Sequence, residues 1–388
     1  MEVFLVGGAV RDRLLGLPVK ERDWVVVGAT PEQMLELGYR PVGKDFPVFL
    51  HPETGEEYAL ARSERKTAPG YHGFEVHADP DVSLEEDLKR RDLTINAIAE
   101  TPDGRLIDPF HGEQDLRQGL LRHVSPAFVE DPVRILRVAR LAARFAPYGF
   151  HVAHSTNALM RTMVDNGEVD HLVPERVWAE LVKALATDSP ATFFKVLHGC
   201  GALAVLFPEI EEEYAGEETP HRQRGLPPAL AALQDSAARS ADPRVRFAVL
   251  LRALGARRPR EQRLARGEAL CRRLRAPNDY SRLALDAIRL ESAVTSDDPA
   301  RLLELMETAG AFRHGDHWRR LLAVYRAAGL IDERRADSLQ RAAAHAAGIN
   351  AAALGDHGLR GPELGAAIRA RRLQAVREAL GDEEHGAH

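Results

Sequence analysis

The sequence changes character at about Asp131, and this change limits the folds that the chain can adopt. Before it, short apolar runs rich in β-branched residues alternate with turn residues, which is typical of buried strands. After it, Ala, Leu, Arg and Glu recur with almost uninterrupted helical periodicity, and strand signals do not clearly return. The pattern predicts an α+β fold, with a small head of mixed sheet and helices followed by an all-helical neck, body and tail. We place these regions at residues 1–125, 126–220 and 221–388 of the 388-residue chain.

The head region contains four candidate strands and two candidate helices. The strands are Val3–Val6, Trp24–Val27, Pro47–Leu50 and Glu57–Ala61, with residues 52–55 as a hairpin turn. The helices are Ala9–Leu15 and Pro31–Leu37, the second capped by Thr30. Residues 63–82 are polar and contain glycine and proline, so we expect a mobile loop there.

Composition excludes some classes of protein but does not identify a partner. The formal net charge is −6, so phosphate binding would require a local basic face rather than a basic protein. No apolar run approaches the roughly 18 residues of a membrane helix, and the N-terminus lacks the basic segment of a signal peptide. Only Cys200 and Cys271 occur, far apart, which excludes a thiolate metal cluster. We therefore expect a cytoplasmic protein with no membrane partner.

Two features near the N-terminus indicate a site for phosphates and metal. Gly7 and Gly8 stand between a strand and a helix, where backbone N–H groups approach a phosphate, and Arg11 lies one turn further. Glu21 and Asp23 are two residues apart, so on a strand both carboxylates project from one face and can bind Mg²⁺. A glycine turn or an exposed acidic pair is common by itself, and only their combination favours a nucleotide site.

A third feature is a stripe of charged residues near the start of the helical region. Asp131, Arg134, Arg137 and Arg140 are spaced by three, so on a helix they form a slowly drifting stripe. Apolar residues fill the positions between them, which indicates that part of this helix packs against the head rather than being fully solvated. Arg90–Asp92 begins another expected helix, which runs through Thr94 and Ala97, with Asp92 favourable at its N-terminus.

Five motifs in order resemble class II tRNA nucleotidyltransferases, the CCA-adding enzymes, in their gamma-proteobacterial form. They are Leu5–Asp12, Glu21–Trp24, Arg90–Ala97, Ile107–Gly112 and Glu130–Arg134. The resemblance implies template-independent addition and repair of the 3′-terminal CCA of tRNA from CTP and ATP, with release of pyrophosphate, by two-metal nucleotidyl transfer with Mg²⁺. The segment Ser63–Tyr71 resembles the one thought to let the family change from C to A addition, and its retention favours full CCA activity.

The resemblance also assigns roles to individual residues. Glu21 and Asp23 would be the catalytic metal ligands, although many family members have aspartate at the position of Glu21. Asp131 and Arg134 would read the Watson–Crick edge of the incoming base. Cytosine and adenine each present an amino donor beside a ring-nitrogen acceptor, which complements an acceptor-only aspartate and a donor-only arginine. The other nucleotide-binding residues would be Gly8, Arg11, Arg91, Arg137 and Arg140.

The second half of the chain is where relatives often carry a histidine–aspartate phosphohydrolase domain. Here the expected His-Asp falls on Arg252-Ala253, and Arg266-Gly267-Glu268 stands near the expected histidine pair, so we expect no phosphohydrolase activity. The arginines from Arg252 to Arg275 either contact RNA phosphates or form a solvated helix face. His314 and His317 have no obvious partner ligands for a metal.

Alternative interpretations remain. A poly(A) polymerase of the same superfamily shares the head motifs, and a non-catalytic tRNA-binding protein could retain the fold. Either a monomer or a homodimer is compatible with the sequence.

Overall fold

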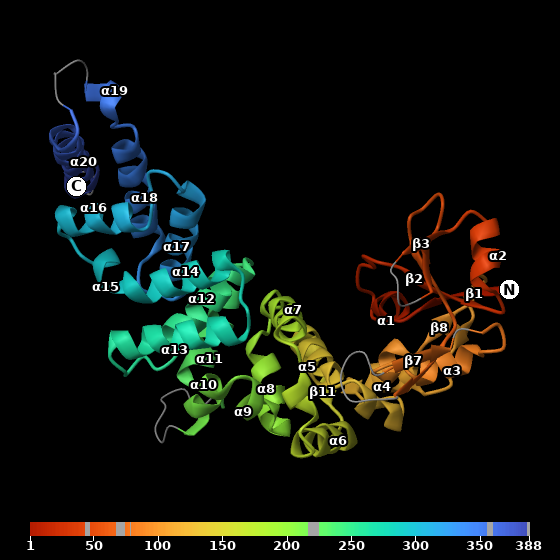
Figure 1. The fold of residues 1–388 in the computed structure, drawn as a ribbon. Coiled ribbons are helices and arrows are strands. Elements are labelled where there is room, and N and C mark those ends of the chain that lie inside the picture. The colour runs from red at the N-terminus through yellow and green to blue at the C-terminus, as the bar shows by residue number, and fades with distance from the viewer. Residues whose placement is uncertain (43–46, 67–73, 78, 216–224, 355–359, 386–388) are drawn as a thin grey trace. The chain divides into compact units, whose positions relative to one another are not determined.

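The computed structural model describes residues 1–42, 47–66, 74–77, 79–215, 225–354 and 360–385 (Figure 1). By its internal contacts the chain forms two compact units: Met1–Ala184 with Thr192–Leu206, and Leu185–Ala191 with Phe207–His388. Every strand in the described ranges lies in the first unit, whereas the second is helical. The predicted α+β class is thus confirmed, while the division at residues 125 and 220 stays a prediction.

A seven-stranded mixed sheet forms the framework of the first unit. Its order is β3-β4-β5-β2-β1-β8-β9, and only the β2–β5 pair is parallel. The strands are β1 (Glu2–Val6), β2 (Asp23–Val27), β3 (Arg40–Val42), β4 (Val48–Leu50), β5 (Glu57–Leu60), β8 (Ala99–Glu100) and β9 (Leu106–Ile107).

Apolar residues cover both faces of this sheet. Neighbouring residues of a strand point to opposite faces, so Val25 and Val26 of β2 enter two different clusters. Val25 packs in the cluster that contains Leu88 of α3 (Leu84–Lys89), and Val26 packs with Met34 of α2 (Pro31–Glu36). A strand buried on both faces reads as a continuous apolar run, which is why the sequence identified β1 and β2 clearly.

The helices predicted in the head are present, with small changes at their ends. Helix α1 is Gly8–Leu14, and α2 begins after Thr30, whose side chain accepts a hydrogen bond from the backbone N–H of Gln33. The side chain of Gln33 accepts from the N–H of Thr30 in return, so both groups satisfy donors that a helix N-terminus leaves unpaired.

The prediction of a mobile loop at residues 63–82 is wrong where two strands lie in the described part of this segment. Strands β6 (Ser63–Lys66) and β7 (Phe74–His77) form an antiparallel pair, and residues 67–73 and 78 lie outside the described ranges. The sequence of β6 is polar throughout, so it lacks the apolar pattern by which a strand is recognised. A second small departure is β11 (His151–Val152), which pairs in parallel with β10 (Leu120–Leu121) beyond the point where strand signals ceased.

The rest of the first unit is mainly helical. After α4 (Gly112–Gln118) the chain forms α5 (Val133–Phe145), which is buried along most of its length. The helices that follow in this unit are α6 (His154–Asp165), α7 (Pro174–Leu185), α8 (Ala191–Cys200) and α9 (Ala202–Leu206). Short 3-10 turns are η1 (Thr94–Asn96), η2 (Pro126–Glu130), η3 (Ala146–Tyr148) and η4 (Glu168–His171).

The second unit continues with helices to the end of the described chain. They are α10 (Pro208–Glu211), η5 (Glu212–Ala215), α11 (Pro228–Ala237), α12 (Pro243–Ala253), α13 (Arg260–Arg273), α14 (Asn278–Arg289), α15 (Glu291–Val294), α16 (Pro299–Thr308), α17 (Gly315–Ala327), α18 (Glu333–Ala347), α19 (Ala351–Leu354) and α20 (Pro362–His385). Among the described residues, no helix is both long enough and apolar enough to cross a membrane.

Candidate active site

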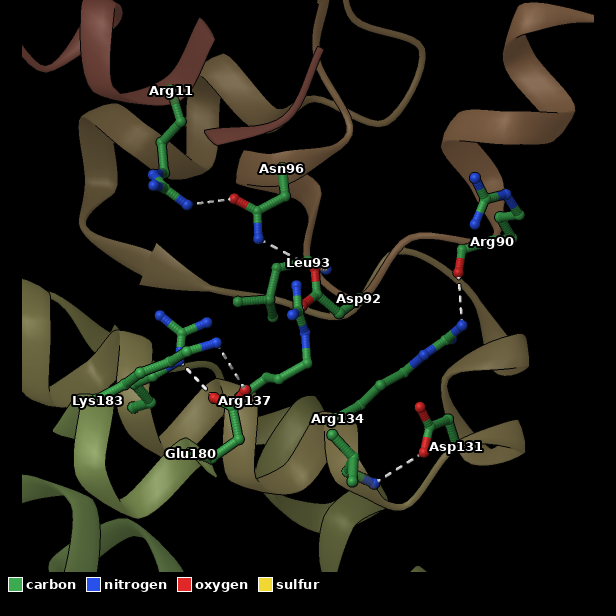
Figure 2. A network of polar contacts seen from close by, with 12 residues as sticks. Arg11, Arg90, Asp92, Leu93, Asn96, Asp131, Arg134, Arg137, Glu180 and Lys183 are labelled. Atoms are coloured by element: carbon green, nitrogen blue, oxygen red, sulfur yellow. Dashed lines mark hydrogen bonds and ion pairs between the residues drawn. The ribbon is translucent and has the colours of Figure 1, made fainter. Parts of the chain in front are cut away.

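A polar cavity of about 770 Å³ lies in the first unit. Residues of α1, the start of β2, the end of α3, η1, α5 and α7 line it, so it collects side chains that are distant in sequence. All nine residues proposed from the sequence are among them: Gly8, Arg11, Glu21, Asp23, Arg91, Asp131, Arg134, Arg137 and Arg140. Figure 2 shows the polar contacts around part of this cavity.

The antiparallel pairing of β1 with β2 brings the acidic pair to the glycine turn. Asp23 is opposite Val6 in the register, and Gly7 follows Val6 directly. Gly7 has a φ of 71°, which favours glycine, and a Cβ atom there would lie 3.0 Å from Nη1 of Arg91. Glu21 differs from the prediction, because β2 begins at Asp23 and Glu21 precedes the strand. Both carboxylates nevertheless reach the cavity.

The surroundings of Asp23 shift its proton equilibrium. Partial enclosure by the cavity raises the pKa of this carboxyl, the positive charge of Arg91 acts in the opposite direction, and the negative charge of Glu21 raises the pKa further. Two neighbouring carboxylates that repel each other favour a bound cation. Mg²⁺ is commonly held by one or two carboxylates together with substrate phosphates and water, so this pair fits it. Among the described residues no group of three or more His, Cys, Asp or Glu side chains is arranged to hold a metal.

Arg11 is a buried cation at the glycine turn, 4% exposed. It donates from Nε and Nη2 to Oδ1 of Asp12 (2.9 and 2.7 Å) and from Nη1 to Oδ1 of Asn96 (2.5 Å). Its guanidinium also lies over the ring of Phe145, 4.9 Å from the centroid. Burial lowers the pKa of Arg11 and Asp12 opposes this effect, so the side chain is a fixed cation beside Gly8.

Arg90 and Arg91 are held by one fully buried carboxylate. Asp87 accepts hydrogen bonds from Arg90 (Nε, 3.0 Å, and Nη2, 2.6 Å) and from Arg91 (Nη2, 3.0 Å). Burial alone would raise the pKa of Asp87, but the two guanidinium groups outweigh it and the pKa is lowered.

The prediction that Arg90–Asp92 begins a helix is wrong: α3 ends at Lys89, Arg90 caps its C-terminus, and only the 3-10 turn η1 follows. The capping box of Ser83 and Glu86 is the signal that marks the true helix start.

Helix α5 supplies a wall of arginines. Arg134 donates from Nη1 to the carbonyl oxygen of Ala127 (2.8 Å) and from Nη2 to that of Arg90 (2.7 Å). Arg137 donates from Nε to Oδ2 of Asp92 at 2.7 Å, and this carboxylate raises the pKa of Arg137. Each arginine therefore has a fixed orientation toward the cavity.

Asp131 lies outside this helix, contrary to the predicted stripe. Pro132 separates it from α5, and Asp131 has extended backbone geometry. Its Oδ1 accepts a hydrogen bond from the backbone N–H of Val133, the first residue of α5, at 3.0 Å. Asp131 thus precedes the helix, so the spacing of three extends only from Arg134 onward.

Sequence reasoning missed the part of the cavity wall that α7 forms. Arg176, Glu180 and Lys183 line it, and Glu180 accepts a hydrogen bond from Nε of Arg140. These three residues recur at helical spacing, which is the signal that could have identified them. Other lining residues not assigned from the sequence are Arg62, Asn96 and Arg144, and Arg144 continues the stripe of α5 by one turn.

In the second unit, glutamates pair with many of the arginines between Arg252 and Arg275. Arg252 and Arg263 bind Glu291, Arg258 and Arg266 bind Glu212, and Arg273 binds Glu209. These contacts weaken the interpretation of this cluster as an RNA-binding face, because the charges are already partnered within the unit. His317 likewise contacts Asp286, with 3.0 Å between Nε2 and Oδ2.

The chain is similar to known nucleotide-adding proteins in both family models and full-length relatives. A family model described as "Poly A polymerase head domain" matches residues 3–122, and one described as "Probable RNA and SrmB- binding site of polymerase A" matches residues 149–214. A multifunctional CCA protein of Thioalkalivibrio sulfidiphilus is 54% identical over 402 residues, covering 97% of this chain and 98% of its own. A CCA-adding enzyme of Coxiella burnetii is 47% identical over 385 residues, covering 98% and 96%.

Solved structures show the same fold at lower identity. The Bacillus stearothermophilus CCA-adding enzyme in complex with CTP has a TM-score of 0.67 at 23% identity, covering 97% of this chain and 89% of that one. The Thermotoga maritima CCA-adding enzyme complexed with tRNA-CCA has a TM-score of 0.61 at 22% identity, covering 100% and 92%. The likeness in fold therefore extends over both units.

Proposed function

The chain belongs to the family of CCA-adding enzymes, and on this premise we propose that it adds the 3′-terminal CCA to tRNA from CTP and ATP and releases pyrophosphate. The observation that carries the proposal is one cavity in which the carboxylates of Glu21 and Asp23 face a surrounding set of arginines. Nucleotidyl transfer needs this combination, since an acidic pair holds the metal and cations accept the triphosphate. Full-length relatives named as CCA proteins, at 47–54% identity, favour tRNA addition over poly(A) synthesis.

We propose Mg²⁺ as the metal, held by Glu21 and Asp23. When bound, it would lower the pKa of the RNA 3′-hydroxyl and neutralise charge at the α-phosphate. The protein's own contribution is positioning and charge. Arg11 and Arg91 stand beside the glycine turn, where the triphosphate would lie on backbone N–H groups. Arg137 and Arg140 extend the cationic wall that stabilises the charge of the leaving pyrophosphate.

Asp131 and Arg134 would select the base, and their contacts within the protein leave hydrogen-bond acceptors on Asp131 and donors on Arg134 available to the base. A carboxylate has about four lone-pair sites and a guanidinium has five N–H donors. Asp131 accepts three hydrogen bonds, two at Oδ1 and one at Oδ2, which leaves Oδ2 able to accept the amino group of C or A. Two donors of Arg134 are bonded to backbone carbonyls, and the others can meet the ring nitrogen. Uracil and guanine would present the reverse pattern and leave these groups unpaired.

A nucleotide-addition assay tests the proposal. The purified chain is incubated with Mg²⁺, tRNA that lacks its 3′ CCA, and one labelled nucleotide at a time. We expect CTP alone to extend the tRNA by two residues, ATP to add one residue after them, and UTP and GTP to give no product. Long A tails without incorporation of C would instead identify a poly(A) polymerase. Cytoplasmic location and a monomeric or homodimeric state stay predictions.

A further inference from the structure

Asn96 connects two arginines of the cavity that lie on different helices. It belongs to the 3-10 turn η1, is 7% exposed, and lines the cavity. Its Oδ1 accepts a hydrogen bond from Nη1 of Arg11 on α1, and its Nδ2 donates to Oδ1 of Asp92 at 3.0 Å. Oδ2 of Asp92 in turn accepts from Nε of Arg137 on α5. The chain of contacts therefore runs from the glycine turn to the arginine wall.

The amide of Asn96 satisfies both of its neighbours. Arg11 can only donate, and an ionised Asp92 can only accept, so the residue between them must accept on one side and donate on the other. This requirement also fixes the orientation of the amide, with the oxygen toward Arg11 and the nitrogen toward Asp92. Aspartate at this position would keep the acceptor and lose the donor, and alanine would lose both.

The two arginines depend on this link to different degrees. Arg11 has a second anchor in Asp12, but those bonds use Nε and Nη2 and leave Nη1 to Asn96. Arg137 is held through Asp92, which is fully buried and also accepts from the backbone N–H of Leu93. Removing the amide leaves Oδ1 of Asp92 with the backbone N–H of Leu93 as its remaining donor, and it leaves Nη1 of Arg11 without its acceptor.

We propose that Asn96 is a positioning residue for the incoming nucleotide. Through its contacts it fixes the position of Arg11 at the glycine turn relative to Arg137 on α5. This proposal rests on the proposed function, because the nucleotide is what both arginines would bind. It concerns the triphosphate rather than the base, since neither Asp131 nor Arg134 contacts Asn96 in the described hydrogen bonds.

The test compares Asn96→Ala and Asn96→Asp with Thr94→Val in the full-length protein. Thr94 is in the same turn, is buried, and donates from Oγ1 to Asp115 at 2.7 Å, but does not line the cavity. Thr94→Val therefore removes a buried hydrogen bond from η1 without touching the proposed link. The readouts are KM for CTP, KM for ATP, KM for tRNA, and direct binding of CTP by calorimetry without tRNA.

We expect both Asn96 variants to raise KM for CTP and for ATP by about tenfold, as for a lost hydrogen bond to a charged group. KM for tRNA and the preference for CTP over UTP should change less than about twofold, and Thr94→Val should retain the nucleotide KM of the unchanged protein. Asn96→Asp is isosteric, so it tests the donor to Asp92 even if Asn96→Ala folds poorly.

Two results would overturn the inference. One is an unchanged KM for nucleotides in Asn96→Asp, which would show that donation to Asp92 is not needed. The other is an equal rise in the nucleotide KM for Thr94→Val, which would reduce Asn96 to a general support of the turn. A failure of the proposed function is distinguishable from both, because the unchanged protein would then add no nucleotide to tRNA while its binding of CTP could still be compared with that of the variants.

Discussion

Arg176 holds Asp131 with two hydrogen bonds, from Nη2 to Oδ2 at 2.8 Å and from Nη1 to Oδ1 at 3.2 Å. The two residues are 45 positions apart, and the pair joins α7 to the segment before α5. A bidentate arginine fixes both the position and the plane of a carboxylate. Asp131 is thus an oriented acceptor rather than a flexible one, and the base selection that we propose for Asp131 would depend on a residue of α7.

We therefore predict that Arg176→Ala relaxes the choice of base. A mobile Asp131 would no longer penalise the wrong donor and acceptor pattern, so the ratio of kcat/KM for CTP to that for UTP should fall by about tenfold or more. Lys183→Ala is the matched control, because Lys183 lines the same cavity from α7 without contacting Asp131. A selectivity that falls equally in both variants would contradict the specific role of Arg176.

Arg134→Ala should also relax base choice, by removing the donor that meets the ring nitrogen. It should in addition lower stability by about 1–3 kcal/mol, because the partly buried hydrogen bonds to the carbonyl groups of Ala127 and Arg90 are lost. Arg134→Lys separates the effects, since lysine retains the charge but lacks the planar fork. Incorporation of CTP and UTP, measured beside urea unfolding, checks both parts. Unchanged selection between CTP and UTP in Arg134→Ala would count against the base-reading role.

Replacing the acidic pair should separate catalysis from binding. Glu21→Ala and Asp23→Ala should each lower the rate of addition by at least about a thousandfold, because most of the charge stabilisation at the α-phosphate depends on the metal. Binding of tRNA, measured by filter retention, should change little. Glu57→Ala is the control, since Glu57 is the exposed partner of Asp23 in the β2–β5 register and does not line the cavity. Addition at the unchanged rate in either acidic-pair variant would remove that residue from the metal site.

The sequence predicted the parts of the site whose pattern is local. Gly7-Gly8 after an apolar strand and a carboxylate before another strand were both recognisable, because buried strands and positive-φ glycines leave strong local signals. The arginines of α5 were recognisable because they recur at helical spacing, which is also a local pattern. Their convergence on one cavity follows from the β1–β2 register and the packing of α5, which no local pattern records.

What the sequence did not predict depends on partners far away in the chain. Arg176 and Glu180 have ordinary helical spacing, and only their contacts with Asp131 and Arg140 give them a place in the site. The same holds in the second unit, where the sequence allowed the arginines from Arg252 to Arg275 to form either an RNA-binding face or a solvated helix face. Their pairing with Glu209, Glu212 and Glu291 is not visible in the sequence. From the sequence alone, an arginine that is paired within the protein cannot be distinguished from an arginine that binds a ligand.

The buried Asp87 makes a further prediction, about stability and pH. The pKa of Asp87 is lowered in the folded protein, so its ion pairs stabilise the fold above the unfolded pKa of about 3.9 and this contribution is lost as the pH falls. Asp87→Asn should cost about 3 kcal/mol near pH 7, because two largely buried guanidinium groups lose their counter-charge. The gap in unfolding free energy between the two proteins should narrow below about pH 4.5 in urea titrations. A gap that stays constant down to about pH 3.5 would contradict the linkage.

Gly112 gives the sharpest test of packing beneath the site. A Cβ atom there would lie 2.2 Å from the carbonyl oxygen of Thr94 and 2.7 Å from Cγ1 of Ile98, so α4 and η1 approach too closely for any side chain. We predict that Gly112→Ala lowers stability by about 1–3 kcal/mol and also raises KM for CTP, because η1 carries Asn96. Gly199→Ala, in α8, is the control: its Cβ would have no neighbour nearer than 3.8 Å, and alanine is the better helix former. Thermal unfolding and CTP kinetics on both variants check the prediction, and a stable Gly112→Ala protein with unchanged KM would show that η1 can shift without disturbing the nucleotide site.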